Sequence, residues 1–183
     1  MSTEAPLTAP PGTTISMYSA SVPVFVRMLG NLDRWLDAAT AHAAAKSFDP
    51  QVLLGARLAP DMLPFSKQIQ IASDTVKHCV ARLSGVTAPK FEDNEATIAE
   101  LKQRIAKTLD FVQSVPADQI NGSEAKLIEL PMRGRSALTF SGEAYLKHWA
   151  MPNFYFHVTT AYALLRHNGV ELGKMDFLGA PPK

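Results

Sequence analysis

The sequence predicts an all-α protein, a four-helix bundle with a small β-hairpin inserted between the third and fourth long helices. Four stretches repeat apolar residues every three or four positions, which is the period of an amphipathic helix. Residues 119–142 break that period with two short extended runs around a glycine turn. A length of 183 residues suits one compact domain. We therefore expect a single domain over residues 14–183, preceded by a disordered tail at residues 1–13.

Composition and charge narrow the class of protein. Hydrophobic residues make up 46% and charged residues 19%, with a formal net charge of +1, which fits a soluble globular protein and disfavours nucleic acid as a partner. One cysteine, Cys79, excludes an intramolecular disulfide. No apolar run approaches the ~18 residues of a membrane span. We expect a cytoplasmic protein with no membrane partner.

The first long helix lies within residues 14–46. Pro23 is tolerated in a first turn but kinks a helix interior, so the helix begins near Ser21 or a short helix precedes it. Its core-facing stripe consists of Val22, Phe25, Leu29, Leu32, Leu36, Ala39 and Ala43. Asp49 followed by Pro50 then predicts a short helix over residues 51–58, because Asp caps helix starts and Pro suits the first turn.

The second long helix is predicted to begin between Asp61 and Pro64 and to end at Ser84, before Gly85. A polar ridge accompanies its apolar stripe, with members at i, i+4 and i+7. The ridge consists of Gln70, Asp74 and Lys77. It is either a solvated face or, for Gln70 and Asp74, the edge of a cavity.

The third long helix is the cleanest amphipathic segment. Asp93 or Asn94 is the expected N-cap, and Pro116 ends the helix. The pattern places Glu100 and Arg104 on the outer side, as a weak i, i+4 pair. The core stripe consists of Ile98, Leu101, Ile105, Leu109 and Val112.

The predicted hairpin pairs residues 126–132 with residues 136–140. After it, residues 142–150 start a helix that Pro152 kinks or restarts, and the fourth long helix continues to Asn168 before Gly169. One short turn is expected in the final segment.

Asn153 and His157 stand out in the fourth helix because they are polar and four residues apart among apolar neighbours. Side chains at i and i+4 lie on the same helix face, so both are predicted to meet whatever that face packs against. Burying them costs free energy unless they form hydrogen bonds or have a use. The pair therefore indicates either a polar pocket or a core histidine whose hydrogen bonds are satisfied.

Several segments carry a family resemblance that covers about residues 16–179. The most specific is Pro152-Asn-Phe-Tyr-Phe-His157, supported by residues 56–62, 68–74 and 172–179. These segments resemble an uncharacterised bacterial domain-of-unknown-function family within the DinB/YfiT-like metalloenzyme superfamily. The resemblance implies a homodimer. It also implies a divalent metal, nickel or zinc, held by one histidine of the second helix and two of the fourth.

By position, the metal ligands implied by that resemblance fall at Gln70, Asn153 and His157, of which only His157 keeps the ligand type. Carboxamides are poor ligands for a first-row transition metal, so a degenerate metal site is expected. One interpretation is a metal-free pocket lined by Asp74, Asn153 and His157, in which Asp74 partners the imidazole. A structural histidine and an intact metal site are the alternatives.

Three functions remain open on this basis. The first is binding of a small molecule in the polar pocket, with His157 as the one side chain to nominate as a base. The second is a non-catalytic dimeric module with a stress-related or regulatory role. The third, taken from the resemblance, is a metal-dependent hydrolase or thiol transferase. Neither a GxSxG elbow nor a phosphate-binding glycine loop occurs in the sequence.

Overall fold

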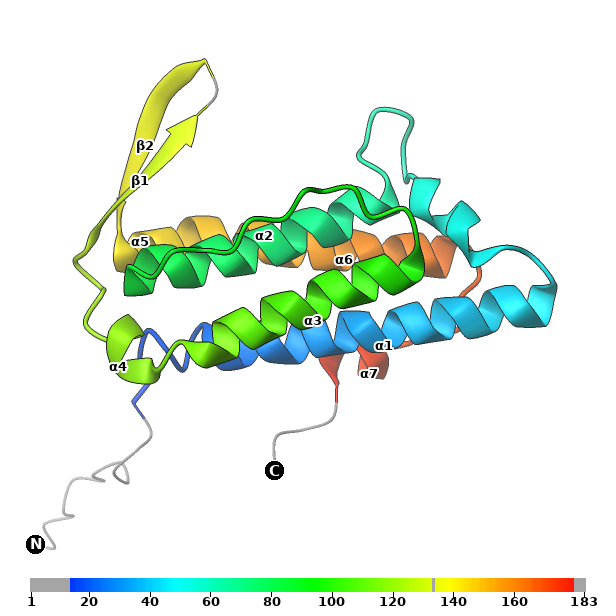
Figure 1. Ribbon diagram of the computed structural model, residues 1–183, viewed down its shortest axis with the longest axis horizontal. Helices are drawn as coiled ribbons and strands as arrows, with labels where there is room; N and C mark the ends of the chain where they lie inside the picture. Colours follow the sequence, from blue (N-terminus) through cyan, green and yellow to red (C-terminus); the bar gives the residue numbers. More distant parts are fainter. Residues whose placement is uncertain (1–13, 133, 180–183) are drawn as a thin grey trace, which may run out of the picture.

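The computed structural model describes residues 14–132 and 134–179. Four long helices lie side by side along the molecule: α1 (Val22–Lys46), α2 (Phe65–Ser84), α3 (Ile98–Ser114) and α6 (Met151–His167). Their mutual contacts run in a ring, from α1 to α3, α2, α6 and back to α1 (Figure 1). The predicted tail at residues 1–13 lies outside the described residues.

Short elements connect the long helices: η1 (Pro50–Gly55), α4 (Ala117–Ile120), α5 (Gly142–Tyr145) and η2 (Leu146–Ala150). One more, α7 (Lys174–Leu178), follows α6. A predominantly helical chain with one hairpin was expected and is confirmed. The described residues form seven α-helices rather than four, because short helices also occur in two connections (α4 and α5) and after α6 (α7). No helix in the described ranges is long and apolar enough to cross a membrane.

Several predicted helix ends are confirmed by their capping geometry. The Asp49 side chain accepts a hydrogen bond from Gln51 N at 2.9 Å, as expected of an N-cap before proline. Gly85 ends α2 with φ +89°, a left-handed conformation that glycine adopts without steric cost. The predicted cap of α3 is wrong. Thr97 caps α3, and it forms a capping box with Glu100.

The predicted hairpin is present as antiparallel strands β1 (Leu127–Met132) and β2 (Arg135–Ser141), with Leu130 opposite Leu138. It extends from the end of the molecule where α5 begins (Figure 1). Phe140 anchors it to the helices, with its ring 5.9 Å from that of Trp149. After α5, the segment expected to kink or restart near Pro152 contains the π turn η2, which ends at Ala150, two residues before the proline.

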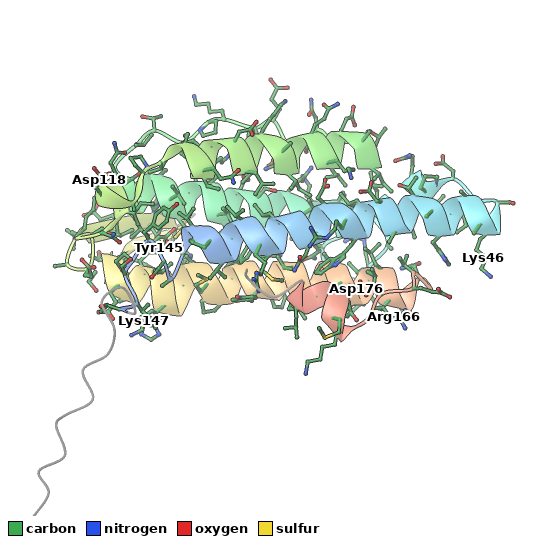
Figure 2. The ribbon with its side chains drawn as sticks, turned by 90° about the horizontal axis from the view of Figure 1, so that it is seen from below. Lys46, Asp118, Tyr145, Lys147, Arg166 and Asp176 are labelled. Carbon is green, nitrogen blue, oxygen red and sulfur yellow. The ribbon has the colours of Figure 1, made fainter. Side chains whose placement is uncertain are left out.

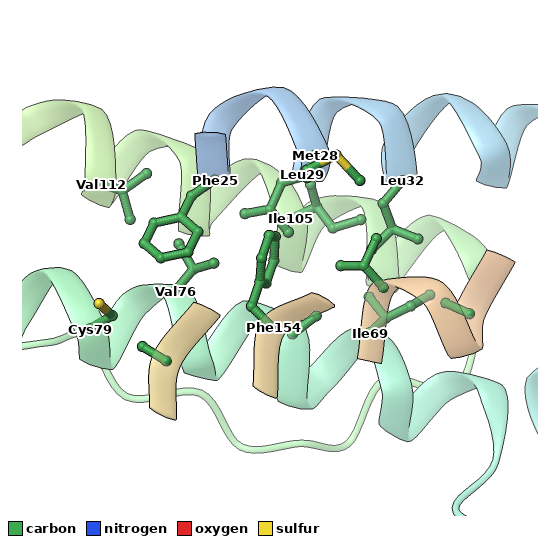
Figure 3. Close-up of a cluster of buried hydrophobic side chains, with 14 of the residues drawn as sticks. Phe25, Met28, Leu29, Leu32, Ile69, Val76, Cys79, Ile105, Val112 and Phe154 are labelled. Atoms are coloured by element: carbon green, nitrogen blue, oxygen red, sulfur yellow. The ribbon is translucent and has the colours of Figure 1, made fainter. Parts of the chain in front are cut away.

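One hydrophobic core runs through the space between the four long helices. Phe25 of α1 and Phe154 of α6 meet edge to face at 5.1 Å, beside Val76 of α2 and Ile105 of α3 (Figure 3). Figure 2 shows the long axis of this arrangement, with Lys46 at one end and Asp118 and Tyr145 at the other.

The C-terminal helix α7 packs against α1 from outside the ring. Phe177 stacks on Trp35 at 5.6 Å, and Asn31 Nδ2 donates to the carbonyl oxygen of Phe177 at 2.7 Å. The short final turn expected from the sequence is therefore confirmed, and the buried Asn31 has a partner.

The connection from α2 to α3 is a long irregular segment, residues 85–97, which we call the strap. It runs back along α2, so that α3 starts at the same end of the molecule as α2 and lies parallel to it (Figure 1). An irregular connection of this length is unusual in a compact domain and needs its own stabilising contacts.

Candidate functional site

Asn153 and His157 both point at α2, as their spacing predicted. Nδ2 of Asn153 donates to Thr75 Oγ1 at 2.8 Å, and Nδ1 of His157 lies 2.7 Å from Gln68 Oε1. Position 153 thus pairs with 75 and position 157 with 68, so α2 and α6 are antiparallel. The two hydrogen bonds form a polar seam along an otherwise apolar helix interface, and we call these four residues the α2–α6 seam.

The tautomer of His157 follows from the second hydrogen bond of Gln68. Nε2 of Gln68 donates to the carbonyl oxygen of Leu63 at 2.9 Å, so the amide oxygen is the atom that faces the imidazole. Because that oxygen can only accept, Nδ1 of His157 carries the proton. Nε2 is left with an unshared electron pair, and it has no hydrogen-bond partner within the described part of the chain.

Burial keeps the His157 imidazole neutral. The residue is 7% exposed, and loss of solvation lowers its pKa below the ordinary value of 6.5. The ring of Phe156 covers one side, with its centroid 5.1 Å from that of the imidazole. A neutral imidazole with a free Nε2 can accept a hydrogen bond or a proton, which is the chemistry available at this position.

Gln70 and Asp74 do not lie beside His157, which corrects the predicted pocket lining. Gln70 Nε2 donates to Glu95 Oε2 at 2.8 Å, and Asp74 pairs with Lys77 and with Arg104, each at 2.8 Å. Residues 68 and 70 are about 200° apart around a helix, so only the first can face α6 while the second faces α3. Asp74 therefore cannot serve as the anionic partner of the imidazole.

The polar ridge of α2 instead belongs to a cluster centred on Arg104. This side chain is 1% exposed and reaches Asp74, Asp93 at 2.6 Å and Glu95 at 2.9 Å. It lies on the inner side of α3, which corrects the expected outer pair with Glu100. Burial alone would raise the pKa of Glu95, but hydrogen bonds from Arg104, its own backbone and Gln70 lower that pKa below its usual range.

A further histidine, His78, lies on α2 one turn beyond Thr75. Burial, followed by the charges of Lys77 and Arg82, lowers its pKa below 6.5. His78 and Gln68 are ten residues apart, or about 15 Å along the helix axis. That is too far for His78 to share a small ligand with His157, which contacts Gln68.

Gln68 and Thr75, the α2 residues of the seam, were not identified from the sequence. Their spacing of seven residues equals about two helical turns and places them on one face of α2, so this spacing was the signal that could have identified them.

The seam does not offer a ligand set for nickel or zinc. It supplies one imidazole, two carboxamides and one hydroxyl, whereas these ions prefer imidazole, thiolate and carboxylate donors. Across residues 14–132 and 134–179, no three histidine, cysteine or acidic side chains are grouped so that they could hold a metal. The third position implied by the resemblance, Gln70, lies on the other side of α2.

A shallow recess of about 450 Å³ flanks the seam on the outer side of α6. It begins at Phe156 and Thr160, the neighbours of His157 along the helix, and extends to Leu58 in the connection before α2. Pro152, Tyr155, Thr159 and Ala163 complete its lining, which contains no acidic or basic side chain. His157 itself is not among the lining residues.

Comparison with a solved structure now defines the class of protein. The crystal structure of a DinB family member from Shewanella denitrificans superposes with a TM-score of 0.82 and 44% sequence identity, over 91% of this chain and 93% of that one. The fold is therefore that of a DinB-like helical protein.

Residues 17–178 match the family described as a domain of unknown function, DUF1993. The chain belongs to this family, which is uncharacterised, as the resemblance predicted. No curated protein matches the sequence.

Proposed function

We propose that this protein binds a small uncharged molecule at the α2–α6 seam without a metal ion, using Nε2 of His157 to accept a hydrogen bond from the ligand. The observation that carries the proposal is the fixed tautomer of His157, whose Nδ1 is held by Gln68 while Nε2 has no partner among the described residues. Nε2 does not belong to the fully buried polar atoms that lack a partner, so it keeps accessible surface through which a ligand can reach it.

The surroundings favour an uncharged and partly apolar ligand. The recess beside the seam is lined by aromatic, aliphatic and threonine side chains, with no group to neutralise a ligand charge. A charged molecule would lose its hydration there without a compensating ion pair. An N–H or O–H group directed at Nε2 would fix the orientation of the ligand.

The test is a screen of small N–H and O–H fragments against the full chain, observed at the ¹⁵N resonances of the His157 imidazole. We expect at least one fragment to move the Nε2 resonance in a saturable way, and to lose its affinity in His157→Phe. His167→Phe is the matched control, since His167 is exposed on the last turn of α6. A screen in which no fragment perturbs Nε2 would reject the proposal.

A parallel titration with Zn²⁺ and Ni²⁺ addresses the metal-dependent hydrolase or thiol transferase. With one imidazole and no second strong ligand, we expect no stoichiometric binding at micromolar metal. Stoichiometric binding that disappears in His157→Ala would support the metalloenzyme instead.

The second candidate, a dimeric binding module, is favoured by the outer face of α6. Tyr155 and Phe156 are 38% and 55% exposed there, and with Pro152, Thr159 and Ala163 they form a stripe at helical spacing. The stripe carries no charge, so two copies can meet through it around a two-fold axis without repulsion. We propose this face as the homodimer contact.

Sedimentation velocity on Phe156→Asp tests the dimer. The wild type is expected to sediment as a dimer and the variant as a monomer, because a carboxylate would have to be buried in the contact. Val52→Asp, at a residue that is 64% exposed on η1, is expected to stay dimeric. A monomeric wild type would remove this candidate.

A further inference from the structure

A groove of about 470 Å³ lies where α7 packs beside the first turns of α1 and α6. Its lining is mostly apolar and comes from three helices, with Val24, Arg27 and Met28 from α1, Tyr155 from α6, and Phe177 and Leu178 from α7. None of the seam residues contributes to it. A volume of roughly 300–1,000 Å³ and an apolar lining with a few polar groups are typical of small-molecule sites. We call it the α7 groove.

Helix α7 forms a wall of this groove that the bundle holds in place. The ring of Phe177 lies 5.6 Å from the rings of both Trp35 and Tyr162. Nε1 of Trp35 donates to the carbonyl oxygen of Asp176 at 3.2 Å, and Asn31 donates to that of Phe177. The groove therefore has a defined shape, and the indole N–H of Trp35 reports on its wall.

Part of the apolar lining is open to solvent. Tyr155 is 38% exposed and Leu178 is 46% exposed, while Met28 is buried. Covering this surface with a ligand favours an apolar molecule, and the flexible side chain of Met28 can adjust to its shape. Tyr155 also lines the recess beside the seam, so the two concave sites meet at its ring.

Arg27 is the only charged side chain among the described residues that line the α7 groove. It is half-buried, and neither an ion pair nor a hydrogen bond engages its guanidinium within residues 14–132 and 134–179. The other arginines whose side chains the structure describes each donate at least one hydrogen bond; they are Arg34, Arg57, Arg82, Arg104 and Arg166.

The charge of Arg27 decides which apolar ligand fits. A ligand that fills the groove removes water from the guanidinium, and the described lining contains no carboxylate to replace that water. An uncharged ligand would leave the cation with neither hydration nor a partner. A carboxylate neutralises it through two parallel hydrogen bonds. Since there is one cation, a single negative charge is the match.

We propose that the α7 groove binds a monocarboxylate with an aliphatic chain, whose carboxylate pairs with Arg27 and whose chain lies against Met28, Tyr155 and Leu178. The site uses no seam residue, so it goes beyond the function proposed above, and either site could exist without the other.

The experiment titrates the full chain with sodium octanoate at constant ionic strength and follows amide and indole N–H signals by NMR. Saturable shifts are expected at residues 24–28, 155 and 177–178, and at the indole of Trp35 but not at that of Trp149, the other tryptophan of the sequence. Sodium acetate has the charge without the chain, and 1-octanol has the chain without the charge. Each should bind at least about tenfold more weakly than octanoate.

The variant Arg27→Met tests the ion pair, because it removes the charge and keeps an unbranched side chain. It should weaken octanoate binding roughly tenfold and leave the binding of 1-octanol unchanged. Arg34→Met, at an exposed arginine of α1 outside the groove lining, should bind octanoate like the wild type. Equal losses for octanoate and 1-octanol in Arg27→Met would reveal a merely structural effect and overturn the ion pair.

The variant Leu178→Asp tests the apolar side of the groove at an exposed position, and it should abolish saturable octanoate binding. Met175→Asp, on the same helix but outside the lining, should retain it. Non-saturating octanoate shifts, or acetate that saturates the same amides as tightly as octanoate, would overturn the site. Trp35 indole shifts that follow the protein concentration rather than octanoate would assign the groove to a second copy of the chain and likewise overturn the proposal.

Discussion

Gln68 connects two segments through one side chain. Its amide donates to Leu63 O before α2 and accepts from His157 Nδ1 on α6. Since Gln68 is 1% exposed, water does not replace either bond, and the amide sets both the orientation and the tautomer of the imidazole.

Replacing Gln68 by Ala should lower the free energy of unfolding by about 1–3 kcal/mol, because the buried Nδ1–H of His157 loses its acceptor. Urea denaturation measures the loss. Gln113→Ala, at an exposed position of α3, should stay within about 0.5 kcal/mol of the wild type. A Gln68→Ala protein as stable as the control would show that the bond has no stabilising role.

The pH dependence of stability provides a second prediction at His157. Its folded pKa is depressed, so below pH 6.5 the unfolded chain takes up a proton that the folded protein resists. The free energy of unfolding of the wild type should therefore fall relative to that of His157→Gln as the pH drops from 6.5 towards the folded pKa. Above pH 7 the difference between the two proteins should stay constant. Denaturant midpoints at a series of pH values measure this difference, and a parallel course for the two proteins would contradict it.

At the scale of elements, the strap depends on Arg104. The substitution Arg104→Met would leave Asp74, Asp93 and Glu95 without their shared cation. We expect it to lower the free energy of unfolding by about 3–5 kcal/mol. Amide hydrogen exchange should also accelerate across residues 86–96. Lys102→Met offers a contrast: Lys102 pairs with Asp33 and Asp37 at the surface, where a pair contributes only about 0–1 kcal/mol. Equal losses in the two variants would contradict the role of Arg104.

The helices could be predicted from the sequence because apolar period and capping residues are local signals. Asp49 before Pro50 and Gly85 after Ser84 act through neighbouring backbone groups. The N-cap of α3 was misplaced because Asp93 has a favourable capping side chain, but that carboxylate pairs with Arg104, and Asp93 adopts a left-handed φ of +55°. A tertiary ion pair overrode the local preference.

The candidate site could be predicted only in part. The spacing of Asn153 and His157 correctly gave a shared face, since that is a property of one helix. Which face of α2 meets them depends on how two helices are rotated against each other, and the sequence does not encode that rotation locally. The resemblance therefore pointed to Gln70 where Gln68 contacts His157, and Asp74 was expected beside an imidazole that it does not reach, because it pairs with Arg104.

At the scale of the molecule, the ring of helices separates two polar sites. The antiparallel α2–α6 interface carries the seam, and the parallel α2–α3 interface carries the Arg104 cluster under the strap. The apolar core of the ring lies between them. Helix α2 thus supplies residues to both sites from opposite faces. Gln68 and Thr75 face α6, whereas the polar ridge of Gln70, Asp74 and Lys77 faces α3 and the strap.

The most direct test of the central proposal is the ionisation and tautomer of His157, read from imidazole ¹⁵N shifts and ¹⁵N–¹H couplings at pH 7. We expect a neutral ring with a protonated Nδ1 and an Nε2 that has the shift of an unprotonated acceptor. A protonated Nε2, or a positively charged ring at that pH, would contradict the arrangement in which Gln68 holds His157 with Nε2 free to accept a ligand.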